Sequence, residues 1–250
     1  MSTRKPSSIA TKIVATFAVA ALSFSAFAGR YWLGGETADE SGNMFGANAN
    51  WNSKEDGSGD QGKPGSGTST TYFYNYRQGL IVFDETAAVE NNVYVATASE
   101  SPFIWKAAAP SFGIVAMGKE LDVDESSSRT PTWLKIVSGS YSFQKILIGK
   151  TTNSRTTLTM DGGVLETGNS NPSSGADFII CNGSGETASA DVVVNGGRIF
   201  VNGNSLYVGY NGRGSLTINN GGTVEVRDSD KYGWRLDTAI PTSVTVERSC

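Results

Sequence analysis

The stretch Leu206–Val226 reads LYVGYNGRGSLTINNGGTVEV, and its pattern decides the fold. It contains an upstream strand-like run ending in Gly-Tyr, a strand with alternating apolar residues (Leu216–Ile218), an Asn-Asn-Gly-Gly turn, and a second alternating strand. Alternation with period two gives each strand one buried and one outward face. Asn and Gly tolerate the left-handed backbone that a sharp turn between strands requires. The unit is therefore a pair of strands with one apolar side.

Earlier parts of the chain carry copies of this unit. Leu158–Thr167 and Val192–Val201 have the same strand, Asx-Gly-Gly turn and strand, each after its own upstream strand, and a more degenerate copy lies within 113–143. The turn glycines Gly162, Gly196 and Gly221 are 34 and 25 residues apart. Such self-similarity is typical of a solenoid, because one unit cannot bury its apolar face unless copies stack.

A second fold explains the same turns. Asn-Gly between alternating strands is also the strongest short-range signal for a β-hairpin. Asn195-Gly196 and Asn220-Gly221 could therefore close hairpins in an antiparallel β meander or sandwich. The parallel solenoid is favoured because the upstream strand recurs before each turn in the same order.

Residues just before the turn glycines are expected to stack in one column along such a solenoid. This column would hold Ser138, Asp161, Asn195 and Asn220, whose side chains would hydrogen-bond along the axis. A calcium site at Asp161 is the functional alternative. One carboxylate among amides is a poor match for Ca²⁺, which takes about 6–8 oxygen ligands. We therefore predict no metal site and no cofactor.

The stretch 206–226 closely resembles the repeats of autotransporter passenger domains and autotransporter-associated β-strand proteins of bacteria. The segments Tyr31–Gly35, Ala49–Asn52 and Leu80–Asp84, with Pro64 between the last two, resemble the opening that precedes such repeats. The resemblance implies a single-stranded, right-handed parallel β-helix with an irregular N-terminal cap, on the bacterial surface or outside the cell. Too few residues follow Val226 for the β-barrel of an autotransporter, so we expect a stand-alone exported protein or a piece of a larger one.

The N-terminal residues predict export. Residues 1–28 combine basic Arg4, Lys5 and Lys12, the apolar run 13–22, and Ala26-Phe27-Ala28, in the three-part layout of a cleavable signal peptide. The apolar run is too short for a membrane anchor, which needs about 20 residues. We expect a secreted or cell-surface protein that is not integral to a membrane.

The rest of the chain divides by composition. Residues 29–78 are rich in Gly, Ser and Asn and predict a cap and loop, whereas 79–250 contain the solenoid repeats, clearest at 146–226. The formal net charge of the chain is −4 at pH 7. An acidic chain without basic clusters is a poor partner for nucleic acid.

The two cysteines leave their redox state open. Cys181 ends an apolar run and is expected to be a buried free thiol, because unpaired cysteine behaves as a small hydrophobic side chain. Cys250 is the last residue, and a disulfide between the two is the alternative that an oxidising compartment permits.

Catalytic residues are hard to find in this sequence. The chain has no histidine, which removes the commonest base, nucleophile partner and metal ligand. Paired acids could serve a polysaccharide-degrading enzyme. The acidic groups Asp122–Glu125 and Glu225–Asp230 are instead expected to be solvated turn charges, and we predict no catalytic residue.

Aromatic residues near the N-terminus offer a ligand site. Trp32, Trp51, Tyr72 and Tyr74 could form a platform for sugars, or pack as a cap on the first coil. We expect a non-enzymatic surface structural or adhesin-type module that contacts an extracellular glycan or protein. A glycan-binding module or polysaccharide-degrading enzyme on the same scaffold is the alternative.

Overall fold

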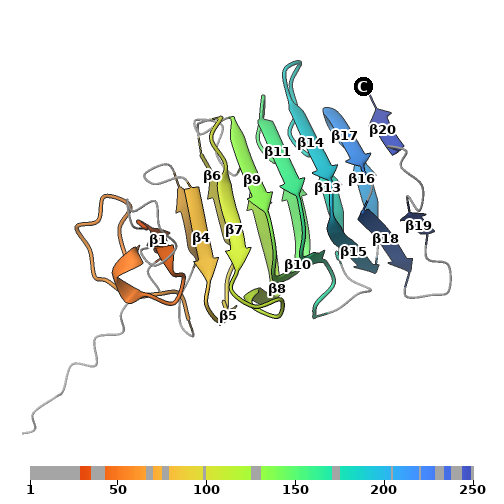
Figure 1. The fold of residues 1–250 in the computed structure, drawn as a ribbon. Helices are drawn as coiled ribbons and strands as arrows, with labels where there is room; N and C mark the ends of the chain where they lie inside the picture. The colour runs from red at the N-terminus through yellow and green to blue at the C-terminus, as the bar shows by residue number, and fades with distance from the viewer. Residues whose placement is uncertain are drawn as a thin grey trace, which may run out of the picture.

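The computed structural model is an all-β molecule with two sheets that run along one axis (Figure 1). It describes residues 29–34, 43–65, 70–74, 79–97, 100–124, 131–170, 175–203, 205–219, 221–228, 234–237 and 244–248. Sheet A has 13 strands. They are β1 (Arg30–Trp32), β2 (Trp51–Asn52), β3 (Thr71–Tyr74), β5 (Thr86–Ala88), β6 (Val93–Ala96), β8 (Gly113–Val123), β10 (Ser140–Ile148), β12 (Val164–Glu166), β13 (Phe178–Ile180), β15 (Gly197–Gly203), β16 (Leu206–Val208), β18 (Gly222–Asp228) and β19 (Trp234–Asp237).

Sheet B has seven strands, of which six are parallel and successive along the chain. The parallel strands are β4 (Gly79–Phe83), β7 (Phe103–Ala107), β9 (Thr132–Ile136), β11 (Arg155–Met160), β14 (Ser189–Val194) and β17 (Arg213–Ile218), followed by antiparallel β20 (Val244–Arg248). The chain passes from each parallel strand of sheet B to sheet A and then returns to sheet B, so every coil adds one layer to the stack. The predicted parallel solenoid is confirmed, with about six turns.

The antiparallel meander is wrong because the Asx-Gly turns join different sheets. Asn195-Gly196 leads from β14 in sheet B to β15 in sheet A, and each strand pairs in parallel with the next coil instead of with its neighbour in sequence. In the described part of the chain, antiparallel strand pairs occur only in the end coils. Both interpretations placed turns at these residues. They differ in strand pairing, and the hydrogen-bond partners of the flanking strands lie one coil away.

Sheet A bends where its long strands are interrupted. β10 pairs along its length first with β12 and then with β13, so those two short strands correspond to one long strand of the preceding coil. Between Phe143 and Lys145 the register to β8 shifts, because three residues of β8 lie opposite one of β10. This bulge lies between the part of β10 that pairs with β12 and the part that pairs with β13.

Glycine in the turns is required by the stacking distance. Gly163 has φ +79°, and a Cβ there would lie 2.7 Å from the carbonyl oxygen of Gly139 in the preceding coil. A Cβ on Gly197 (φ +75°) would lie 2.4 Å from the oxygen of Gly163. Left-handed backbone and close contact with the next coil both exclude a side chain. These two glycines therefore let neighbouring coils approach to normal strand spacing.

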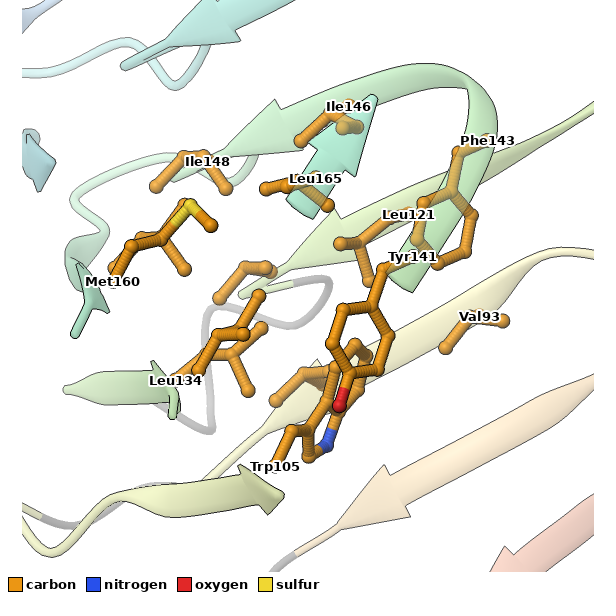
Figure 2. Packing of buried hydrophobic residues seen from close by; sticks show 14 of the residues in the cluster. Val93, Trp105, Leu121, Leu134, Tyr141, Phe143, Ile146, Ile148, Met160 and Leu165 are labelled. Atoms are coloured by element: carbon orange, nitrogen blue, oxygen red, sulfur yellow. The ribbon is translucent and has the colours of Figure 1, made fainter. Parts of the chain in front are cut away.

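The interior is filled by inward side chains from both sheets (Figure 2). In the first coils the core is aromatic, where Trp105 packs against Phe73, Phe83 and Tyr141. Later coils are aliphatic, as in the column Met160, Val194 and Ile218 of sheet B. Burial of this continuous apolar interior supplies the main stabilising force, at roughly 25 cal/mol per Å².

Short antiparallel strands close the ends of the stack. β2 pairs antiparallel with β1 at one end, whereas β19 and β20 pair antiparallel with β18 and β17 at the other. Phe45 donates its N–H to Val82 of β4 (2.8 Å) and so covers part of the first edge of sheet B. Covered edges reduce edge-to-edge association of sheets.

Within the predicted cap and loop region 29–78, the described strands β1, β2 and β3 belong to sheet A. β1 and β3 pair in parallel with the next strands of sheet A, so this region begins the solenoid itself. The Gly/Ser-rich loop after β2 is closed by the buried Asn52 side chain, which donates to the carbonyl oxygens of Gly57 and Gly59. The predicted signal peptide 1–28 lies outside the described residues, and within those residues no helix is long and apolar enough to span a membrane.

The predicted polar column exists, but two of its members were misplaced. Asn195 Nδ2 donates to Asp161 Oδ1 (2.9 Å), and Asn219 Nδ2 donates to Asn195 Oδ1 (2.7 Å), whereas Asn220 lies outside the described residues. The last turn has one residue more than the preceding one, and the column aligns from the end of the strand. Ser138 bonds to the backbone of Ala107 instead. We call Asp161, Asn195 and Asn219 the polar ladder.

Cys181 is buried, its Sγ lies 3.9 Å from the carbonyl oxygen of Gly183, and its backbone is left-handed (φ +59°). Cys250 lies outside the described residues, so the two alternatives for Cys181, a thiol or a disulfide with Cys250, both stay open.

Candidate binding face

Two of the predicted sugar-binding aromatics are part of the core. Trp32 is 2% exposed and Trp51 is fully buried, with their rings 5.1 Å apart in an edge-on contact. Trp51 Nε1 donates to the carbonyl oxygen of Phe45 (2.8 Å), which fixes the ring in the interior. Neither ring offers a face to a sugar, so both side chains serve the cap that was the alternative interpretation.

Tyr72 lies in a stacked column on the outer side of sheet A. Its ring is sandwiched between Tyr31 (centroids 4.5 Å apart, 10° between planes) and Tyr94 (5.4 Å, 23°). Tyr74 packs against the same group and is 9% exposed. Because a sugar stacks on a ring face, and the faces of Tyr72 are covered by its neighbours, this column presents mainly ring edges.

The acidic group at the end of β8 was expected to be solvated turn charge, but its described carboxylates are buried. Asp122 and Asp124 are both fully buried. Asp122 Oδ2 is paired with Lys150 Nζ (2.5 Å), and Asp124 Oδ2 accepts a hydrogen bond from Thr151 (3.1 Å). Both partners come from the turn after β10, so the two carboxylates join neighbouring coils. Glu125 lies outside the described residues.

The Lys150–Asp122 pair keeps its charge in a desolvated position. Desolvation disfavours the ammonium form of Lys150, but the hydrogen bond and charge of Asp122, with the nearby charge of Glu120, outweigh it and raise the pKa of Lys150. A buried carboxylate with a fixed cation partner is a structural pair and a poor general acid.

The second acidic group is also engaged. Glu225 binds Arg227 through both carboxylate oxygens (2.8 and 3.3 Å), and the Arg227 guanidinium lies 4.0 Å from the centre of the Phe200 ring. The side chain of Asp228 and the whole of Asp230 lie outside the described residues.

The outer face of sheet B is a regular surface that carries sugar-compatible side chains. In one row across four coils, Trp133, Thr157, Asp191 and Ser215 are register partners. Ser215 Oγ donates to Asp191 Oδ1 within this row. The parallel row nearer the turns continues with Lys135, Thr159, Val193 and Thr217, and it ends beside the polar ladder. We call these eight residues the sheet B face.

A hollow of about 330 Å³ lies at one side of the sheet B face. Its lining comes from β9, β11, β14 and the segment before β7. The lining residues are Glu100, Pro131, Thr132, Trp133, Arg155, Thr156, Thr157, Ser189 and Asp191. We call this feature the Trp133 hollow.

Trp133 is held in position at the edge of the hollow. Its Nε1 donates to Thr159 Oγ1 of the next coil (3.1 Å), which fixes the orientation of a half-buried ring. Exposed Arg155 and Asp191 lie on the neighbouring strands β11 and β14. An aromatic ring beside carboxylate, guanidinium and hydroxyl groups can pack on the apolar face of a sugar and bond its hydroxyls.

Sequence reasoning did not select Trp133 as a site residue. Its signal was the period-two alternation of β9, in which Leu134 and Ile136 point inward and Trp133 and Lys135 point outward. The sequence signal for this site was therefore an aromatic residue at an outward position of an alternating strand.

No family model, no curated protein and no solved structure matches this chain. The resemblance to autotransporter passenger repeats consequently rests on the residues quoted above, and it contributes to the function only as a proposal.

Proposed function

We propose that the chain is an exported, non-enzymatic β-solenoid that acts as an adhesin-type surface module and binds an extracellular glycan through the sheet B face. The Trp133 hollow carries this proposal, because it brings one oriented aromatic ring together with positively and negatively charged side chains that can form hydrogen bonds. A rigid, repetitive face suits contact with a linear polymer, since neither surface has to reorganise.

A neutral glycan fits the hollow better than a polyanion. Glu100 and Asp191 line it together with a single cation, Arg155, so the local charge repels dense negative charge. Carboxylates accept hydrogen bonds from the vicinal hydroxyls of a neutral sugar.

A polysaccharide-degrading enzyme is the competing function. Such enzymes of the glycosidase type use two carboxyl groups that face one scissile bond. The acids singled out in the sequence are engaged in structural contacts, namely Asp122 with Lys150 and Glu225 with Arg227. These contacts favour a binding module.

The test is a binding measurement on a panel of soluble neutral polysaccharides, with chain length followed in parallel. Trp133→Ala is expected to weaken the best binder about tenfold through loss of the ring contact. Tyr207→Ala removes an exposed aromatic side chain from sheet A and serves as the matched control, which should leave binding unchanged. Trp133 is only partly buried, so both variants should fold, and a cooperative thermal transition of each one checks this.

Two results would contradict the proposal. Equal weakening by both variants would show that the contact is not specific to the sheet B face. Shortening of any polymer would show that the module is an enzyme. Export is tested separately, by sequencing the N-terminus of the protein recovered outside the cytoplasm, which we expect to begin at Gly29.

A further inference from the structure

A second concave feature lies on the opposite side of the turns from the sheet B face. A groove of about 460 Å³ follows the turns that lead from sheet B to sheet A. Its lining residues are Ala107, Ala108, Ala109, Pro110, Ser138, Gly139, Gly163, Val164, Gly197, Arg198 and Phe200. These residues come from four successive coils, so the groove runs parallel to the solenoid axis. Three strand spacings of about 4.8 Å give it a length of about 14 Å.

The floor of this turn groove is fixed by the fold. The positive φ of Gly163 and Gly197, and the close approach of the next coil, keep side chains out of it. The groove is therefore formed before any ligand arrives, which reduces the entropy lost on binding.

The polar groups of the floor are already bonded within the protein. The carbonyl oxygen of Gly139 accepts the N–H of Val164 (2.8 Å), and that of Gly163 accepts the N–H of Arg198 (2.9 Å). Ser138 Oγ exchanges two hydrogen bonds with the backbone of Ala107. A peptide that adds as a strand needs free backbone groups, and a sugar needs many hydrogen-bonding partners. The floor is better suited to an apolar chain.

One end of the turn groove carries a charged side chain, Arg198. Arg198 is the charged side chain among the lining residues, it is exposed, and no described residue forms an ion pair or side-chain hydrogen bond with it. The nearby carboxylate of Glu225 is already paired with Arg227. The opposite end is made of Ala108, Ala109 and Pro110. The groove thus combines one guanidinium, an apolar middle and an apolar far end.

We propose that the turn groove binds a single-chain amphiphile with a carboxylate head group, with the head on Arg198 and the chain along the glycine floor toward Pro110. A carboxylate pairs with one guanidinium through two parallel hydrogen bonds and neutralises it. A phosphate head would bring a second negative charge close to Glu166, the register partner of Phe200 on the neighbouring strand β12. The ligand class is therefore a medium-chain fatty acid.

The test uses dodecanoate below its micelle concentration, because its extended chain is comparable in length to the turn groove. Binding is measured by calorimetry on the intact protein. We expect saturable binding, with butyrate and dodecanol each at least about tenfold weaker, since one lacks the chain and the other the charge. Arg198→Gln should weaken dodecanoate at least about tenfold, for the same reason.

Val164→Trp fills the groove with an outward side chain and should abolish binding without disturbing the core. Arg155→Gln, which removes an exposed arginine of the Trp133 hollow, and Trp133→Ala should both leave dodecanoate binding unchanged. The thermal midpoint of each variant confirms that it is folded.

Several outcomes would overturn the assignment. Unchanged affinity in Arg198→Gln would remove the head-group site, and equal affinity for dodecanol would remove carboxylate recognition. Absence of saturable dodecanoate binding, or survival of binding in Val164→Trp, would remove the groove as the site. None of these results touches the glycan proposal, which depends on a different face.

Discussion

The first and last coils of the solenoid have the same backbone but different interiors. In sheet B, Ile81, Trp105 and Ile136 occupy one inward column, which continues as Met160, Val194 and Ile218. The early coils mix aromatic and aliphatic side chains, and their turns include the longer segment 108–112. The later coils repeat similar aliphatic residues with short Asx-Gly turns.

This difference explains why the repeats are visible in only one part of the sequence. Strand register along an axis requires apolar inward positions and turns that allow stacking, and it does not require identical side chains. The aromatic coils meet that requirement through individual ring contacts, such as Trp105 with Tyr141 at 5.0 Å. The aliphatic coils meet it by repetition. Similar geometry therefore arises from one specific and one generic form of packing.

The largest expected effect comes from breaking the specific packing. Trp105→Ala should lower the free energy of unfolding by about 3–5 kcal/mol, because it opens a cavity beside three aromatic rings. Leu158→Ala in the aliphatic half should lower it by about 2–4 kcal/mol. Urea unfolding followed by tryptophan fluorescence and circular dichroism measures both.

Trp105→Phe sharpens the same comparison. The buried Nε1 of Trp105 has no hydrogen-bond partner in the structure, so the smaller ring removes an unsatisfied donor while it loses volume. We expect Trp105→Phe to be clearly milder than Trp105→Ala. If Trp105→Phe lowered the free energy of unfolding as much as Trp105→Ala, the contacts that a phenyl ring can keep with the neighbouring rings would contribute little to stability.

An intermediate effect comes from the turns of the generic half. Gly175→Ala places a Cβ at φ +64° with nothing within 4 Å, so it should lose about 1 kcal/mol from backbone strain alone. Gly163→Ala adds a collision with the oxygen of Gly139 and should lose about 2 kcal/mol more. Equal losses, measured by urea unfolding, would show that the coils can move apart without penalty.

The smallest effect is a pH dependence of the polar ladder. The hydrogen bond from Lys135, at 2.7 Å, and then that from Asn195 hold the pKa of Asp161 below its ordinary value of 3.8. A lowered folded pKa means that this stabilisation is complete above pH 3.8 and is lost as the pH falls through the folded pKa. We expect Asp161→Asn to lose stability at neutral pH and to match the wild type in strong acid.

Urea midpoints between about pH 2 and about pH 7 measure this dependence. Asn195→Ala should reduce it without removing it, because the Lys135 contact remains. A constant difference between wild type and Asp161→Asn at every pH would contradict the assignment.

The fold could be predicted from the sequence because it depends on the order of strands and turns along the chain. An upstream strand before each Asx-Gly turn distinguishes stacked coils from hairpins. The strands expected within Leu158–Thr167 and Val192–Val201 are confirmed as β11 and β12, and as β14 and β15. The misplaced ladder residue, Asn220 for Asn219, shows the limit. One extra residue in the last turn moves the alignment from the glycine to the end of the strand.

The candidate site was not accessible in the same way. Composition selected Trp32 and Trp51, but alternation in strands decides whether a ring faces the core, and these two face inward. The role proposed for Trp133 depends on Asp191, which lies two coils away and 58 positions later in the chain. Unequal loops between coils conceal such distances from inspection of the sequence.

The claim that both halves share one parallel register can be tested directly with engineered disulfides. Register partners in neighbouring strands lie about 4.8 Å apart, within the range that a disulfide spans. The pair Ile104→Cys with Lys135→Cys lies in the aromatic half, and Val193→Cys with Thr217→Cys lies in the aliphatic half. Val193→Cys with Ser215→Cys is the control, shifted by two residues.

The measurement is the fraction of each pair that oxidises in the folded protein, in a background where Cys250 is replaced by Ser. The account predicts that both in-register pairs oxidise to a similar, high extent and that the shifted pair stays largely reduced. Efficient oxidation in the aliphatic half with none in the aromatic half would contradict the shared register, and it would confine the solenoid to the visible repeats.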